Sequence, residues 1–126
     1  NPKFKNMKTP NILVFLGFFT KNIKKEITFS NQKYKICSSA IGVQLKKESH
    51  LICGIICNEK TFVYDSNNIF VESDWLKGKE GMDKYFDNKE TIFIYGKDIK
   101  FTGMYVLIYL KVWFCVFYVG LFENTT

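Results

Sequence analysis

The sequence predicts an α+β fold that is predominantly an antiparallel β-sheet with little helix. Three observations indicate this class. The chain is 47% hydrophobic and 17% aromatic, which is enough apolar material for a folded core. Its apolar runs are short and are bounded by polar residues or glycine, as strands usually are. A length of 126 residues suits one domain, which we expect over residues 1–111, with an apolar strand and a polar tail over 112–126.

The individual elements follow from these short runs. We expect strands over residues 12–15, 35–43, 51–57, 61–64, 69–72, 91–95, 104–110 and 112–119. One or two helical turns are expected within residues 79–86, because Glu80 and Lys84 have the i,i+4 spacing of a helical ion pair. The rest of the chain is expected to form turns and loops.

Residues 103–122 leave two alternatives open, because this stretch is long enough to cross a bilayer as a helix. A lysine at the centre of a spanning helix costs about 2.5–3.5 kcal/mol, and Lys111 lies at the middle of the stretch. Its β-branched and aromatic residues equally suit two consecutive strands with Lys111 near their junction. We therefore favour strands over a membrane anchor.

Charge and cysteine content restrict the class of function. The net charge is +6, but the eighteen basic residues are all lysines scattered in ones and twos, which argues against a nucleic-acid partner. The four cysteines lie within apolar runs and predict free thiols in a reducing compartment, the cytoplasm or the nucleus; they are Cys37, Cys53, Cys57 and Cys115. Their spacing is not that of a zinc site, and we expect neither metal nor cofactor.

The only histidine, His50, stands at the start of an apolar run that is followed fifteen residues later by Asp65. If Asn58 and Glu59 form a two-residue hairpin loop, Ile52 lies opposite Asp65. His50 then shares the face of Ile52 and is a diagonal neighbour of Asp65, at roughly 7 Å between backbones. A three-residue loop would instead place the two side chains on opposite faces.

This juxtaposition has two interpretations. A carboxylate that orients an imidazole produces a general base, because it fixes the tautomer and stabilises the imidazolium formed on proton uptake. Alternatively, His50 is a surface residue and Asp65 caps a turn, since the sequence DSNN over residues 65–68 has good turn chemistry. The spacing alone favours the second interpretation.

A set of motifs around His50 favours the first interpretation. In chain order they are TPNILVF (9–15), ITFS (27–30), YKI (34–36) with AI (40–41), His50, FVYDS (62–66) and YVLIYL (105–110). This order resembles the C-terminal, histidine-box half of the ubiquitin-specific proteases, which are papain-like cysteine peptidases. The resemblance covers residues 9–111 and implies a palm-type sheet, with a proline-led strand, a turn at 27–30 and a tyrosine-led strand.

The resemblance also implies roles for individual residues. His50 matches the general base, Asp65 the residue that orients it, and Ser66 the position of a second, supporting acidic residue. Glu48 and Ser49 replace the two glycines that precede the histidine in the family, and Leu51 replaces the following aromatic residue. The implied reaction is deubiquitinase-type hydrolysis of an isopeptide or peptide bond, and the implied partner is ubiquitin or a ubiquitin-like protein.

No cysteine of the chain has the features of a papain-type nucleophile, which belongs at a helix N-terminus. Cys37 lies in an expected strand, and no helix-forming run follows it. A variant of the assignment is the SUMO-protease and adenain class of papain-like peptidases, in which a cysteine follows the aspartate. Cys115 is the only cysteine after Asp65, and its apolar surroundings argue against this variant. We therefore expect the nucleophile to lie outside this chain.

Three functions remain open from the sequence. The first is the histidine-bearing part of a cysteine peptidase completed by a Cys-bearing half. The second is a catalytically inactive palm that binds proteins. The third is a small protein anchored to a membrane through residues 103–122.

Overall fold

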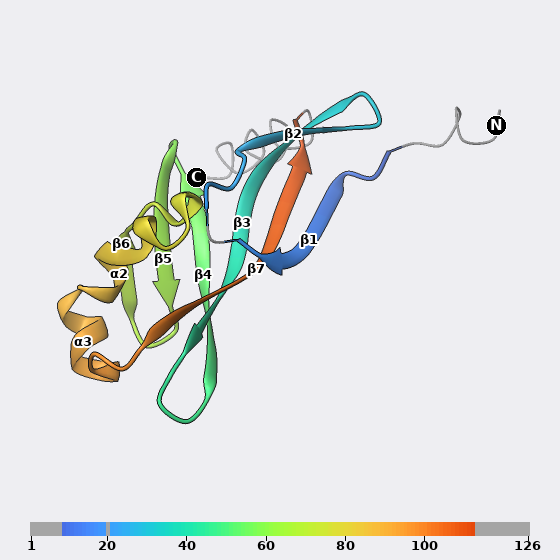
Figure 1. Ribbon diagram of the computed structural model, residues 1–126. Coiled ribbons are helices and arrows are strands. Elements are labelled where there is room, and N and C mark those ends of the chain that lie inside the picture. Colours follow the sequence, from blue (N-terminus) through green and yellow to red (C-terminus); the bar gives the residue numbers. More distant parts are fainter. Residues whose placement is uncertain (1–8, 20, 113–126) are drawn as a thin grey trace.

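The computed structural model describes residues 9–19 and 21–112. Seven strands form one antiparallel sheet in the order β1-β7-β3-β4-β5-β6, and β2 pairs with β3 beside this path (Figure 1). The strands are β1 (Ile12–Phe18), β2 (Glu26–Phe29), β3 (Gln32–Gln44), β4 (Ser49–Cys57), β5 (Lys60–Asp65), β6 (Ile69–Glu72) and β7 (Lys100–Lys111). The predicted class, predominantly antiparallel β with little helix, is confirmed.

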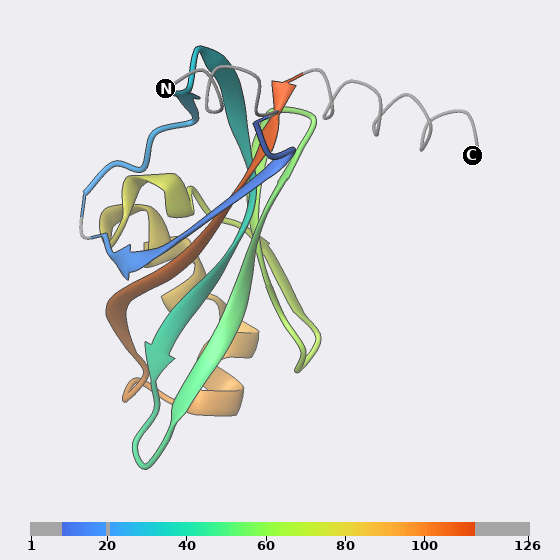
Figure 2. The same cartoon turned by 90° about the vertical axis from the view of Figure 1, so that its right-hand side faces the viewer.

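Four short helices lie between β6 and β7 in the chain. They are η1 (Trp75–Lys77), η2 (Glu80–Met82), α2 (Asp83–Phe86) and α3 (Lys89–Tyr95), where η marks a 3-10 helix. They lie together on one side of the sheet (Figures 1 and 2). The helical turns expected within residues 79–86 are therefore present.

The core lies between these helices and the sheet, and Trp75 is its largest fully buried side chain. A Cβ at Gly54 of β4 would lie 2.6 Å from the Trp75 ring, so the indole occupies space that any other residue at position 54 would fill. The Trp75 Nε1 donates a hydrogen bond to the Ile55 carbonyl at 3.3 Å, and the Tyr105 hydroxyl donates to the Trp75 carbonyl at 3.1 Å. Trp75 thus connects η1 to β4 and β7.

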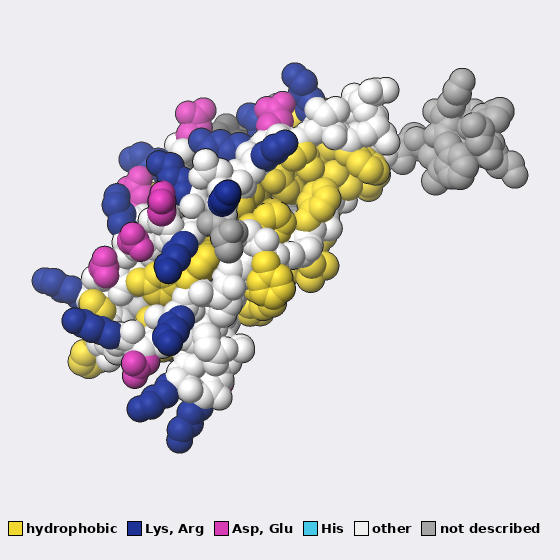
Figure 3. Space-filling model, viewed as in Figure 1, with side chains coloured by type: hydrophobic (Ala, Val, Ile, Leu, Met, Phe, Trp, Pro, Cys, Tyr) yellow, Lys and Arg dark blue, Asp and Glu magenta, His cyan; other side chains and the backbone are white. Residues whose placement is uncertain are grey.

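The β1 end of the sheet is apolar and open. In β1 the side chain of Leu16 is 79% exposed and that of Phe18 is 75% exposed, and β7 is the only strand that pairs with β1 within the described residues. On the side of the sheet that carries the helices, Phe15 and Tyr109 help to line an apolar hollow of about 300 Å³. Figure 3 shows hydrophobic side chains gathered at this end of the molecule. Such a surface is typical of a site that binds another protein or segment.

Most predicted strands are present, and two predictions are wrong. The strands expected over residues 12–15, 35–43, 51–57, 61–64, 69–72 and 104–110 lie within β1, β3, β4, β5, β6 and β7. Residues 26–29, however, form β2, whereas the resemblance implied a turn at 27–30. The turn lies later, at Ser30 and Asn31, which both have positive φ values and connect β2 to β3.

The second wrong prediction is the strand over residues 91–95, which belong to helix α3. Asn88 begins this helix, and its side chain accepts a hydrogen bond from the Glu90 N–H. Gly96 ends the helix with φ 71°, a conformation that glycine adopts without strain. The two caps, together with the contacts of Tyr95 with His50 and Asp65, therefore outweigh the β propensity of the residues between them.

The structure describes only the first part of the apolar stretch 103–122. Residues 103–111 lie in β7, where the Lys111 Nζ donates a hydrogen bond to the Thr9 carbonyl at 3.2 Å. Of the strand predicted over 112–119, only Val112 is described, and it lies beyond the end of β7. Within residues 9–19 and 21–112, no helix has the length and apolar character needed to cross a membrane.

Candidate functional site

The β4–β5 hairpin brings His50 and Asp65 together. Its turn consists of Asn58 and Glu59, which both have positive φ values (50° and 65°), as a tight two-residue hairpin requires. The pairing begins with Cys57 opposite Lys60, which is the predicted register. His50 lies beside the buried Val43 of β3, and its side chain therefore faces the helices. Of the two loop lengths that the sequence left open, the structure therefore has the two-residue loop, which places His50 and Asp65 on one face.

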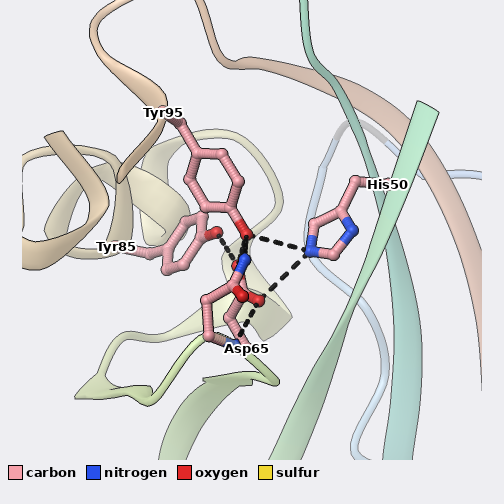
Figure 4. A network of polar contacts seen from close by, with 5 residues as sticks. His50, Asp65, Tyr85 and Tyr95 are labelled. Carbon is pink, nitrogen blue, oxygen red and sulfur yellow. Dashed lines mark hydrogen bonds and ion pairs between the residues drawn. The ribbon is translucent and has the colours of Figure 1, made fainter. Parts of the chain in front are cut away.

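The predicted contact is also present. The His50 Nε2 lies 3.1 Å from the Asp65 Oδ1, with 24% of the histidine side chain exposed and none of the aspartate side chain (Figure 4). The same Asp65 oxygen accepts a hydrogen bond from the Asn67 backbone N–H at 3.2 Å, which closes the turn that follows β5. The two interpretations of the sequence are thus compatible, because Asp65 caps its turn and contacts the imidazole.

Two tyrosines that the sequence did not indicate complete the site. The Tyr85 hydroxyl of α2 donates to the Asp65 Oδ2 at 2.9 Å, and the Tyr95 hydroxyl of α3 donates to the same oxygen at 2.7 Å. They follow Asp65 by twenty and thirty residues and reach it only because the helices pack on this side of the sheet (Figure 4). No spacing rule connects such residues; the available signals are the helical turns expected within 79–86, which include Tyr85, and the caps of α3, the helix that carries Tyr95.

Asp65 is ionised in this environment. Burial raises the pKa of its carboxyl, but hydrogen bonds from Tyr95, the Asn67 N–H, Tyr85 and His50 outweigh burial, and the net pKa lies below the ordinary value of 3.8. The tyrosines respond in the opposite sense. Burial and the hydrogen bond to Asp65 raise the pKa of Tyr95 to about 12 and raise the pKa of Tyr85 as well, so both hydroxyls keep their protons at neutral pH.

We predict that Asp65 titrates below pH 3.8 in the folded protein. Since its pKa is lower in the folded than in the unfolded chain, the unfolded chain takes up more protons as the pH falls. The stability that Asp65 provides is therefore present above the unfolded pKa and is lost as the pH falls through the folded pKa. Following the carboxyl ¹³C chemical shift of Asp65 against pH tests this; a midpoint above 3.8 contradicts it.

The contact with Asp65 also determines which nitrogen of neutral His50 carries the proton. An ionised carboxylate can only accept a hydrogen bond, so the facing Nε2 carries the proton. The second ring nitrogen, Nδ1, points away from Asp65 and the tyrosines (Figure 4). In neutral His50 this Nδ1 has the free lone pair, and it is the atom that can remove a proton from a bound group.

Among the described residues, no thiol lies beside His50. Cys53 and Cys57 lie three and seven residues beyond His50 in β4, and alternation directs their side chains to the opposite face of the sheet. Cys37 lies in β3 six residues before Val43, a separation of about 20 Å along a strand. Burial raises the pKa of the Cys37 and Cys53 thiols, which disfavours the reactive thiolate. Cys115 lies outside the described residues.

Ser66, the predicted supporting residue, is exposed. It follows Asp65 directly and lines a shallow depression with Leu51 and Tyr64, residues of the opposite face of the sheet. Ser66 therefore does not join the hydrogen-bond network of His50 and Asp65, and the turn after β5 supports Asp65 through the Asn67 N–H instead.

Comparisons with models of protein families, with curated proteins and with solved structures found no match to this chain. Within residues 9–19 and 21–112, no three histidine, cysteine or acidic side chains lie close enough together to hold a metal ion. The site consists of an imidazole in contact with a fully buried carboxylate.

Proposed function

We propose that this chain is the histidine-bearing part of a papain-like cysteine peptidase related to the ubiquitin-specific proteases, with the nucleophilic thiol outside this chain. One observation carries the proposal: the His50 Nε2 contacts the fully buried Asp65 while Nδ1 points away from the network. This is the arrangement that a cysteine peptidase requires of its base, because the free nitrogen accepts the thiol proton.

The roles follow from this geometry. The His50 Nδ1 accepts the proton of the nucleophilic cysteine thiol. The resulting thiolate attacks the carbonyl of an isopeptide or peptide bond after a ubiquitin-like C-terminus. Asp65 stabilises the imidazolium, which then donates the proton to the leaving amine as the C–N bond breaks. Water, deprotonated by the same Nδ1, hydrolyses the thioester and restores the thiol.

A ubiquitin derivative with a thiol-reactive group at its C-terminus tests the proposal. We expect labelling of the protein encoded by the longest natural reading frame that contains this chain, which we call the long form. We expect no labelling of the 126-residue chain alone. His50→Ala should slow the labelling by about 10²–10⁴-fold, which is the usual contribution of a general base.

The control is Lys47→Ala, a change in the exposed β3–β4 loop that should leave the labelling rate unchanged. Circular dichroism of each variant establishes that it is folded. The proposed peptidase would be refuted if the folded long form were not labelled. It would also be refuted if the His50→Ala variant of the long form were labelled as fast as the wild type.

A second candidate is a catalytically inactive palm that binds ubiquitin or a related protein. The exposed apolar surface of β1 and the absence of a nearby thiol from the described residues favour it. The expected result in that case is saturable binding of ubiquitin by this chain, measured by calorimetry, without labelling of either form. Charged substitution at Leu16, the most exposed apolar residue of β1, should weaken the binding.

A further inference from the structure

The Tyr95 hydroxyl contacts three polar groups at once. It lies 2.7 Å from the Asp65 Oδ2, 2.7 Å from the Asn67 Nδ2 and 3.2 Å from the His50 Nε2. The tyrosine and histidine rings are also close, with centroids 5.6 Å apart. Gly96 lies directly after Tyr95 and ends α3, so the tyrosine stands at the end of the helix, with its hydroxyl against the side chains of His50 and Asp65 (Figure 4).

The directions of these hydrogen bonds follow from the chemistry of the groups. The only proton of the Tyr95 hydroxyl goes to Asp65, because an ionised carboxylate is the strongest acceptor within reach. The tyrosine oxygen then has two lone pairs. One accepts from the Asn67 Nδ2, and the other faces the His50 Nε2, which also carries a proton. The Nε2–H is thus shared between Asp65 and Tyr95.

We propose that Tyr95 is a positioning residue that holds the His50 ring with Nε2–H inside the network and Nδ1 outside it. Its value for catalysis rests on the proposed function. With Asp65 alone, the ring has one acceptor and can rotate about that contact; two acceptors at different positions define the plane and the direction of the ring. Tyr95 thereby aims the base at the place where a thiol and substrate would lie.

Tyr85 provides a natural comparison. Both tyrosines donate to the Asp65 Oδ2, but only Tyr95 contacts His50. Tyr85→Phe and Tyr95→Phe each remove one donor from the carboxylate, whereas only Tyr95→Phe also removes an acceptor from the imidazole. The difference between the two variants therefore reports the contacts that Tyr95 makes and Tyr85 does not, which are those with His50 and Asn67.

The test uses ¹H–¹⁵N NMR of the 126-residue chain, in which His50 is the only histidine and needs no further assignment. The quantity measured is the exchange rate of the Nε2-bound proton with water. Loss of one hydrogen bond of about 1.4 kcal/mol corresponds to about a tenfold faster exchange. We expect about this increase for Tyr95→Phe and less than a twofold change for Tyr85→Phe.

A further variant, Asn67→Ala, keeps the proposal testable if Tyr95→Phe does not fold. It removes the amide that holds the Tyr95 oxygen but keeps the backbone N–H that binds Asp65, and Asn67 is exposed. We expect its exchange rate to lie between those of the wild type and Tyr95→Phe.

Equal exchange rates in the wild type, Tyr95→Phe and Asn67→Ala would overturn the proposal, because Asp65 alone would then hold the ring. Equal acceleration by the two tyrosine variants would also overturn it. The measurement needs no thiol, so a failure of the ubiquitin labelling would refute the peptidase and leave this result standing.

Discussion

Asp65→Asn is expected to lower the free energy of unfolding by about 3–5 kcal/mol, the usual cost of removing one partner from a buried charged network. The Asp65 side chain is fully buried and accepts hydrogen bonds from the Asn67 N–H, His50, Tyr85 and Tyr95. An asparagine of the same size can accept at only one of its two terminal atoms. Its amide nitrogen would face donors and leave at least one buried hydroxyl without an acceptor.

Urea unfolding followed by circular dichroism measures this effect at neutral pH. The matched control is Asp98→Asn, which changes an exposed aspartate and should alter the free energy of unfolding by at most about 0.5 kcal/mol. A loss below 1 kcal/mol for Asp65→Asn would mean that the tyrosines and His50 find other partners, and that the carboxylate does not organise the site.

Trp75→Ala is expected to lower the free energy of unfolding by about 3–5 kcal/mol. Truncation of a fully buried tryptophan leaves a cavity and also removes apolar surface from the core. Gly54 beneath the ring has no side chain that could fill the space. The lost Nε1–H also leaves the Ile55 carbonyl without this donor. Since Trp75 joins η1 to the sheet, the helical segment that carries Tyr85 and Tyr95 should loosen first.

Thermal unfolding of Trp75→Ala and of Phe93→Ala separates burial from aromatic content. Phe93 is 90% exposed on α3, so its removal should change the free energy of unfolding by at most about 0.5 kcal/mol. If both variants unfolded at the same temperature, the packing of η1 against β4 would contribute little to the stability of the protein.

The β4–β5 hairpin shows how far local sequence information reaches. Asn58 and Glu59 form the predicted two-residue turn, and once its length is known the period of two places every side chain of both strands on a face. The His50–Asp65 contact follows from these two facts. It was predictable because it depends only on residues within one hairpin, where the chain itself limits the geometry.

Helix α3 shows where such information ends. Residues 91–95 have the composition of a strand, and they become helical because Asn88 and Gly96 cap a segment that contacts the sheet through Tyr95. The placement of Tyr85 and Tyr95 beside Asp65 depends on this packing, and so does the environment that keeps the carboxylate ionised.

The fold class and most of the strands could be predicted from the sequence, and so could the meeting of an imidazole with a carboxylate on the condition that the β4–β5 loop has two residues; the structure supplied that loop length. All of these rest on periodicity and on contacts between residues close in the chain. The tertiary structure decided which side of the sheet the helices cover, how deeply Asp65 is buried and which hydroxyls surround it. These depend on packing between segments that are distant in sequence, where many arrangements satisfy the same local preferences and only the complete set of contacts selects one.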